Sequence, residues 1–124
     1  MVILDANVIL RYLLNDNQSM AEEAEKHIEE GSASVTAEVI AEVVYVLHGV
    51  YSLERNIISE TIKGFLSLVV CSDKESLILA LNTYAEHNLD FVDCLLFAYH
   101  AVKGVEIVTF DRKLKNLIDE YDAE

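Results

Sequence analysis

Residues 2–9 read "VILDANVI", in which a short aliphatic run ends at Asp5 and an amphipathic run begins directly after it. This pattern predicts a buried strand over residues 2–4 followed by a helix over residues 6–14. A second junction of the same kind occurs at residues 105–113, "VEIVTFDRK", where a predicted strand over 105–109 ends just before Asp111. The chain therefore contains two predicted strands that are each followed by an aspartate.

The rest of the chain alternates in the same way between helical and strand patterns. Thr36 is a good N-cap residue, and Gly104 is a good residue for ending a helix. The alternation favours an α/β fold in which a parallel sheet is covered by helices. There is no proline, repeat or linker, so we expect a single domain over residues 1–124. The further predicted elements are strands over 33–35 and 68–71 and helices over 18–30, 37–50, 54–67, 74–87, 91–103 and 111–120.

Composition limits the class of protein. The 22 acidic and 9 basic residues give a formal net charge of −13, which repels nucleic acid at long range. No apolar run reaches the roughly 18 residues of a membrane span, and no signal peptide is apparent, so we expect a cytoplasmic protein without a membrane partner. Cys71 and Cys94 lie in apolar runs, which favours reduced core residues over a disulfide or a zinc site.

Asp5 and Asp111 become candidate site residues because of where a parallel sheet binds ligands. In open α/β sheets, ligands bind in the crevice outside the carboxyl ends of the strands. If the strands over 2–4 and 105–109 are neighbours, the two carboxylates face each other across that crevice.

Glu42 is a third candidate, because it borders the apolar stripe of the predicted helix over 37–50. Glu38 lies further toward solvent. Glu42 is therefore expected near the edge of the core, although an ordinary flanking glutamate fits the pattern equally well.

Asp93 is a fourth candidate, in the stretch "DFVDCLLFAYHAVKG", residues 90–104. This helix is apolar nearly all round, and an ionised carboxylate there is costly unless it is paired or bound to a metal. The alternative is a first-turn acid that interacts with the helix dipole, a role that Asp90 fits better. His100, on the same face as Asp93, is interpreted as a half-buried histidine with satisfied hydrogen bonds.

Four acids at one sheet edge would repel each other, and no base lies inside the neighbouring apolar runs. A hard divalent cation, Mg²⁺ or Mn²⁺, fits carboxylate oxygens, and one or two such ions can activate water for phosphodiester hydrolysis. No cluster of cysteine and histidine suggests zinc. Asn7 and Thr109 lie two residues from Asp5 and Asp111 and could orient these carboxylates, or they could serve as cap or turn residues.

Four stretches together resemble the successive motifs of PIN-domain ribonucleases: "LDANVIL", "TAEVIAEVVYVL", "DFVDCLLFAYHAVKG" and "IVTFDRKL". They occur in the family's order, and the resemblance covers nearly the whole chain. It implies a PIN-like three-layer sandwich whose central, mostly parallel sheet has four or five short strands flanked by helices. It also implies a metal site at Asp5, Glu42, Asp93 and Asp111, supported by Asn7 and Thr109.

The short members of this family are VapC-type toxins of toxin–antitoxin pairs. Their resemblance to this chain implies a Mg²⁺- or Mn²⁺-dependent endoribonuclease with an RNA substrate. It further implies a homodimer and a cognate antitoxin whose basic arm covers the acidic site.

The chain departs from the family pattern in two respects. The family often has a fifth strand after the last helix, and "NLIDEYDAE", residues 116–124, shows no clear strand. The net charge is unfavourable for RNA, although Arg112, Lys113 and Lys115 form a basic rim beside Asp111 that could contact the substrate.

Two other classes of function remain open at the level of the sequence. Phosphatases of the haloacid-dehalogenase type also begin with a strand that ends in aspartate, but they need a second aspartate where this chain has Asn7. A PIN-like fold retained as a non-catalytic partner-binding module is the other alternative.

Overall fold

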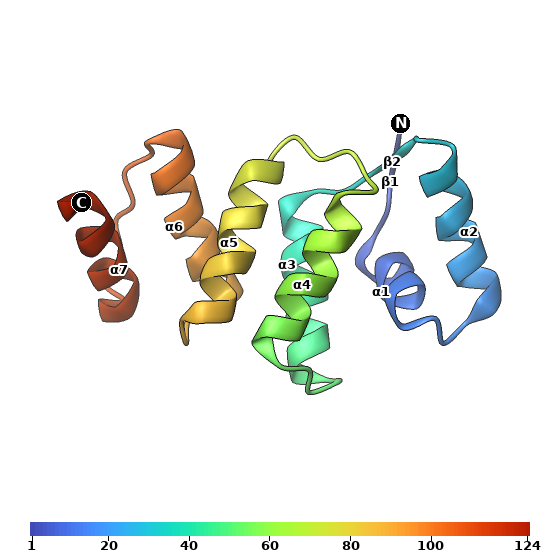
Figure 1. The fold of residues 1–124 in the computed structure, drawn as a ribbon, viewed down its shortest axis with the longest axis horizontal. Helices are drawn as coiled ribbons and strands as arrows, with labels where there is room; N and C mark the ends of the chain where they lie inside the picture. The colour runs from blue at the N-terminus through green and yellow to red at the C-terminus, as the bar shows by residue number, and fades with distance from the viewer.

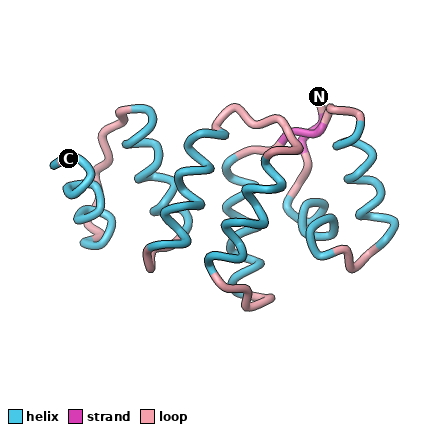
Figure 2. Tube along the Cα trace, in the orientation of Figure 1, coloured by secondary structure: helices cyan, strands magenta, loops and turns pink.

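The computed structural model describes residues 1–124 as a mostly helical molecule with one small sheet. Figure 2 shows how much of the chain is helical. Two strands are present, β1 (Val2–Ile3) and β2 (Ala33–Ser34). The seven helices are α1 (Ala6–Leu14), α2 (Gln18–Glu29), α3 (Ala37–Gly49), α4 (Arg55–Leu66), α5 (Lys74–Glu86), α6 (Phe91–Lys103) and α7 (Arg112–Ala123).

Several helix boundaries were predicted correctly from local patterns in the sequence. Helix α1 has the predicted bounds, and so does α6. Thr36 caps α3, since its Oγ1 accepts a hydrogen bond from the Val39 N–H at 3.3 Å. Gly104 ends α6 with φ +69°, a left-handed conformation that glycine adopts at little cost.

The sheet is parallel, as expected, but it is smaller than expected. Ile3 pairs with Ser34, and the Leu4 N–H extends the ladder to the Ser34 carbonyl at 2.9 Å. The strand predicted over 68–71 is reduced to a single bridge between Ser34 and Val70. Because β2 is the only strand paired with β1, the other edge of β1 is free, and Ile3 is 64 % exposed.

The prediction of a fourth strand over residues 105–109 is wrong for this structure. This segment pairs with no strand, and none of the backbone N–H groups of residues 105–110 donates a hydrogen bond within the protein. Val108 is 84 % exposed and Phe110 is completely exposed. No strand follows α7 either, so neither four nor five strands are formed.

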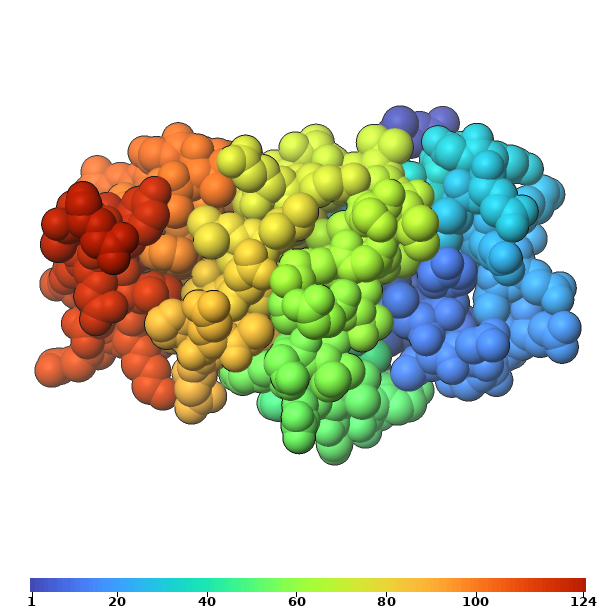
Figure 3. All heavy atoms as spheres, in the orientation of Figure 1, coloured from blue at the N-terminus to red at the C-terminus, as the bar shows by residue number.

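The reason for this difference lies in how α7 packs. Phe97 of α6 forms a small buried cluster with Leu114 and Ile118 of α7. This cluster holds α7 against α6 and keeps the connecting segment 105–110 with them. Figure 1 shows α6 and α7 at one end of the molecule, while α1, α2 and the two strands lie at the other end. The same arrangement is visible in the space-filling view of Figure 3.

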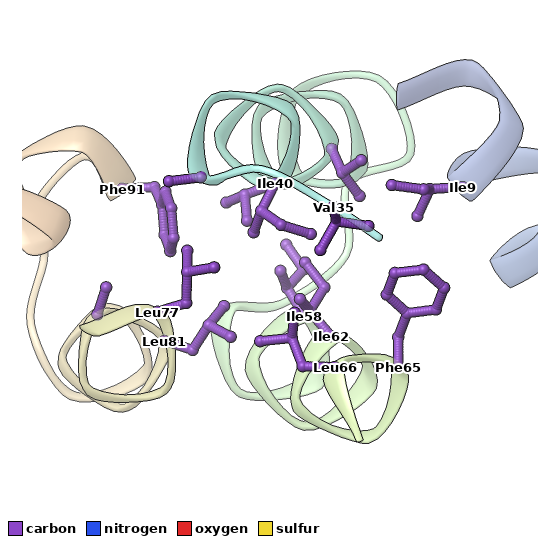
Figure 4. Close-up of a cluster of buried hydrophobic side chains, with 14 of the residues drawn as sticks. Ile9, Val35, Ile40, Ile58, Ile62, Phe65, Leu66, Leu77, Leu81 and Phe91 are labelled. Carbon is purple, nitrogen blue, oxygen red and sulfur yellow. The ribbon is translucent and has the colours of Figure 1, made fainter. Parts of the chain in front are cut away.

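The main core lies between these two ends. It is a cluster of 25 buried residues, to which α1, α3, α4, α5 and α6 all contribute. In Figure 4, Ile40 of α3 faces Ile58 and Ile62 of α4, with Leu77 and Leu81 of α5 beside them. Burying each such side chain stabilises the fold by about 1.5–3 kcal/mol, so this core fixes α4, α5 and α6 relative to one another.

The sequence also led us to expect reduced cysteines and no membrane-spanning segment. Both cysteines are free thiols, and of the two predicted core positions Cys94 lies in the core, whereas Cys71 is only partly buried against it. Cys94 is buried, and its burial raises the pKa of the thiol to about 12. No helix of this structure has the length and apolar character that crossing a membrane requires.

Candidate acidic site

Two of the predicted acids, Asp93 and Asp111, line the same surface pocket. Asp93 lies in the first turn of α6, and Asp111 directly precedes α7. The packing of α7 against α6 therefore brings together two carboxylates that are separated in the sequence. The complete lining is Asn88, Leu89, Asp90, Asp93, Asp111, Arg112 and Lys113.

Asp93 is the acid whose ionisation the surroundings oppose. Partial burial raises the pKa of the Asp93 carboxyl, and the nearby carboxylates of Asp111 and Asp90 raise it further. No base makes an ion pair with Asp93. Asp90 occupies the N-cap position of α6, as expected, but its side chain makes no capping hydrogen bond. The pocket thus contains carboxylate charge that the protein does not neutralise in direct contacts.

Asp5 and Asp111 share a local role that the sequence analysis did not assign. Asp5 Oδ1 accepts a hydrogen bond from the Val8 N–H at 3.0 Å, and Asp111 Oδ1 accepts one from the Leu114 N–H at 3.0 Å. Each aspartate is therefore the N-cap of the helix that follows it, α1 or α7. Aspartate is among the best N-cap residues, so helix capping by itself accounts for an acid at both junctions.

The structure does not bring Asp5 or Glu42 into this pocket. Glu42 is exposed on α3 and makes no hydrogen bond or ion pair, so its expected position at the edge of the core is wrong. Asp5 precedes α1, and α1 and α6 lie on opposite sides of α3. Figure 4 shows Ile9 of α1 and Phe91 of α6 on either side of Ile40.

The expected supporting residues also lie apart from the carboxylates. Asn7 is exposed in α1 and makes no side-chain hydrogen bond. Thr109 Oγ1 accepts a hydrogen bond from the Asp111 N–H at 3.0 Å. Thr109 thus shapes the turn before α7, which is the alternative role considered for it, and its hydroxyl makes no hydrogen bond to the Asp111 carboxylate.

The four acids as a set do not fit a metal ion in this arrangement. Nowhere in the structure do three or more histidine, cysteine, aspartate or glutamate side chains come close enough to hold one. The expected crevice between Asp5 and Asp111 is absent because the strand over 105–109 does not form beside β1. The structure offers instead the pair Asp93 and Asp111, with Asp90 at the same pocket.

The predicted basic rim does lie beside this pair. Arg112 and Lys113 are exposed and line the pocket with Asp93 and Asp111. Lys115 lies in an adjoining pocket to which Arg112 also contributes. The acidic pair is therefore bordered by side chains that could hold the phosphates of an anionic ligand.

His100 is half-buried with both ring nitrogens in hydrogen bonds, as predicted, but its partner Asp122 was not predicted from the sequence. The imidazole is half-buried, with Nδ1 2.8 Å from the Val105 carbonyl oxygen and Nε2 2.6 Å from Asp122 Oδ1. The bond to Asp122 is the main reason why the pKa of His100 is raised, and the bond to Val105 adds to it. The contact is between α6 and α7, and no periodic pattern in the sequence indicates it.

Arg55 was not among the residues predicted from the sequence. It is the first residue of α4, and its guanidinium reaches the loop that precedes α6. The only signal in the sequence was a single arginine at the start of a predicted helix.

The model of the PIN domain matches residues 2–119 of the chain. The chain belongs to the PIN domain family. A "VapC ribonuclease" of Aquifex aeolicus (strain VF5) is 32 % identical to this PIN domain over 125 residues, covering 94 % of this chain and 92 % of that protein. No solved structure matches the chain. The resemblance to PIN-domain ribonucleases is thus confirmed, and it replaces the haloacid-dehalogenase alternative.

Family membership also bears on the fold class. The PIN domain is an α/β fold, and the structure contains a parallel sheet accompanied by helices. The α/β class is confirmed at this level. The sheet of four or five strands is not, because only β1 and β2 form.

Proposed function

We propose that this PIN domain is an endoribonuclease that hydrolyses RNA phosphodiester bonds and depends on Mg²⁺ or Mn²⁺. We propose further that it is the toxin of a type II toxin–antitoxin pair. The observation that carries this proposal is the 32 % identity to a VapC ribonuclease over nearly the full length of both proteins. The un-neutralised carboxylates of Asp93 and Asp111 at one pocket are consistent with it.

The proposed site consists of Asp5, Glu42, Asp93 and Asp111. Mg²⁺ is usually bound through one or two carboxylates together with substrate phosphates, and the pair Asp93 and Asp111 suits this mode. A site that uses all four acids requires Asp5 and Asp111 to lie closer together than they do here. The free edge of β1 and the unpaired segment 105–110 are the backbone elements available for such an approach.

RNA binding by a chain of net charge −13 needs a local excess of positive charge. We assign this role to Arg112, Lys113 and Lys115, which border the acidic pair. Contacts of this kind are made to phosphates and carry little sequence information. Single-stranded or looped RNA is the expected substrate, because its backbone and bases are accessible.

An RNase assay on the purified protein tests the proposal. RNA should be cut in the presence of Mg²⁺ or Mn²⁺, EDTA should abolish the cut, and the products should carry 5′-phosphate and 3′-hydroxyl ends. Asp93→Asn should remove the activity, whereas Asp119→Asn should not, since Asp119 is an exposed acid of α7 outside the pocket. Cyclic phosphate products, or full activity in EDTA, would refute this mechanism.

A non-catalytic binding module is the second candidate, and one observation favours it. The acids that the family resemblance assigns to a metal site are not assembled here. A protein of this kind would show no metal-dependent cleavage under any of these conditions, and Asp93→Asn would leave its partner binding intact.

The proposed partners follow from the charge of the site and from the relative's name. An acidic pocket is suited to an arginine or lysine side chain, so we propose a cognate antitoxin whose basic arm covers Asp93 and Asp111. Its inhibition should weaken as salt is added, because exposed charges are screened within about 8 Å at physiological ionic strength. We also propose that the toxin is a homodimer, which light scattering of the purified protein tests.

A further inference from the structure

Arg55 connects three elements of the fold through one guanidinium group. Its Nη1 donates to the backbone carbonyl oxygens of Tyr84 at 3.2 Å, His87 at 2.8 Å and Leu89 at 2.7 Å. Its Nη2 reaches Asn88 Oδ1 at 3.4 Å. The guanidinium carbon also lies 4.1 Å from the centre of the Tyr84 ring, in a cation–π contact. Arg55 thus links α4 to the end of α5 and to residues 87–89 of the loop between α5 and α6.

The carbonyls that Arg55 binds are ones that regular structure leaves without partners. Helix α5 ends at Glu86, and the carbonyls of the last turn of a helix receive no hydrogen bond from an N–H group of the same helix. The carbonyls of His87 and Leu89 lie in the loop, and Leu89 is buried. A cation at a helix C-terminus is favourable, and the planar fork of arginine can bind several acceptors while it stacks on a ring.

This loop leads directly into the acidic pocket. Leu89 and Asp90 line the pocket together with Asp93. The carbonyl of Asp90 accepts the hydrogen bond of the Cys94 N–H at 3.1 Å, which forms the first turn of α6. Leu89 directly precedes Asp90, the N-cap residue of this turn, so a restraint on Leu89 acts next to the turn that carries Asp93.

A second contact extends from Tyr84 to the same turn. The Tyr84 ring packs edge-on against Phe91, the first residue of α6, with ring centres 6.0 Å apart. Arg55 covers the Tyr84 ring on α5, so the two contacts form a continuous connection from α4 through α5 to α6.

We propose that Arg55 is a positioning residue for the acidic pocket: it fixes loop 87–90 and thereby holds Asp93 in place relative to Asp111. Arg55 itself does not line the pocket. Its effect on RNA cleavage rests on the proposed function, whereas its effect on the loop does not.

The test uses the full chain with Arg55→Met, Arg55→Lys and a matched control. Methionine keeps an apolar contact with Tyr84 but removes every hydrogen bond to the loop. The control is Lys63→Met, because Lys63 also joins α4 to α5, donating from Nζ to Asn82 Oδ1 at 2.8 Å, without touching residues 87–90. Amide hydrogen exchange is measured without metal or RNA, and kcat and KM are measured for RNA cleavage.

We expect Arg55→Met to speed exchange of residues 88–94 about tenfold more than Lys63→Met does, while exchange in the rest of α4 and α5 changes equally in both. We expect kcat to fall about tenfold to a hundredfold with little change in KM, since small displacements of reacting groups carry costs of this size. Arg55→Lys keeps the charge and one donor group, so it should restore part of both losses. If Arg55→Met does not fold, the comparison of Arg55→Lys with Lys63→Met decides the question.

Each outcome has a distinct meaning. Equal loosening of all of α4 and α5 by Arg55→Met and Lys63→Met would overturn the inference, because Arg55 would then contribute only general stability. Selective loosening of residues 88–94 with unchanged kcat would also overturn it. Selective loosening in a protein whose wild type cuts no RNA would support the positioning of Asp93 and refute the proposed function instead.

Discussion

Asp93, in the first turn of α6, and Asp111, the N-cap residue of α7, line one pocket, and no base makes an ion pair with Asp93. Burial raises the pKa of Asp93, and the negative charge of Asp111 raises it further. The two residues line the same pocket because α7 packs against α6, through the cluster of Phe97, Leu114 and Ile118 among other contacts. The acidic pair is therefore a product of tertiary packing, and it costs the folded state free energy whenever both carboxylates are ionised.

Asp93→Asn should consequently stabilise the protein at neutral pH. The pKa of Asp93 is higher in the folded than in the unfolded state, so the folded state loses stability as pH rises from the ordinary aspartate pKa through the folded value. Because Asp93 is only half-buried, we expect a gain of about 0.2–1 kcal/mol at pH 7, or about 1–4 °C in Tm, and almost none at pH 3. Thermal melts at both pH values measure it.

The matched control for this prediction is Asp119→Asn, which removes the same charge from an exposed position on α7. It corrects for the general relief of repulsion in a chain of net charge −13. An equal gain in Tm in both variants, or a lower Tm for Asp93→Asn at pH 7, would show that the folded state does not disfavour the ionised Asp93 carboxylate.

At each of the two capping aspartates, substitution by alanine should lower the free energy of unfolding much more than substitution by asparagine. Asp5→Ala and Asp111→Ala each remove the acceptor of a cap hydrogen bond and should cost about 1 kcal/mol of unfolding free energy. Asp5→Asn and Asp111→Asn keep an acceptor and should cost almost nothing. Urea denaturation of the four variants checks this. Asparagine variants that are as unstable as the alanine variants would mean that the charge, not the cap, matters.

The same asparagine variants separate folding from function. Under the proposed function both should lose RNA cleavage while they keep their stability. A stable Asp5→Asn variant with full activity would remove Asp5 from the proposed site and leave only its capping role.

The sequence predicted those features that depend on nearby residues. The bounds of α1 and α6, the cap at Thr36 and the helix end at Gly104 follow from periodicity and from preferences of single residues. Capping by Asp5 and Asp111 was equally local and could have been inferred, because aspartate directly before a helical run is a typical N-cap pattern.

Features that depend on distant residues were not predictable in this way. A strand forms only where another strand can pair with it, and residues 105–109 have an apolar pattern but no partner in this fold. Their position is decided by the contact of Phe97 with α7. Glu42 shows a related limit, since bordering an apolar stripe does not determine whether a neighbouring element covers a side chain.

The contact between His100 and Asp122 should make the docking of α7 depend on pH. The pKa of His100 is raised in the folded state, so its contribution is present below the ordinary histidine pKa and is lost as pH rises through the folded value. Wild type should therefore lose more Tm between pH 6 and pH 8 than Asp122→Asn does. Asp119→Asn is the charge control and should behave like wild type. Identical slopes for wild type and Asp122→Asn would contradict the prediction.

Cys94 should be inert in the folded protein. Burial raises the pKa of its thiol to about 12, and the thiolate is the reactive form. In a Cys71→Ser background, a thiol reagent such as DTNB should label Cys94 at pH 8 only as fast as the protein unfolds. Rapid labelling of the native protein would show that the region around α6 opens readily.

Segment 105–110 provides a test of whether all four proposed acids can act together. Its backbone N–H groups have no partners within the protein, so they should exchange with solvent almost as fast as in an unfolded chain. If Asp5 and Asp111 bind the same ion, this segment must approach the free edge of β1, where strand hydrogen bonds would protect it. Addition of Mn²⁺ should then slow exchange of residues 106–110 by at least about tenfold, and Asp5→Asn should abolish this protection while Asp119→Asn should retain it. Calorimetric binding of Mn²⁺ without any protection of residues 106–110 would instead restrict the ion to the pocket of Asp93 and Asp111.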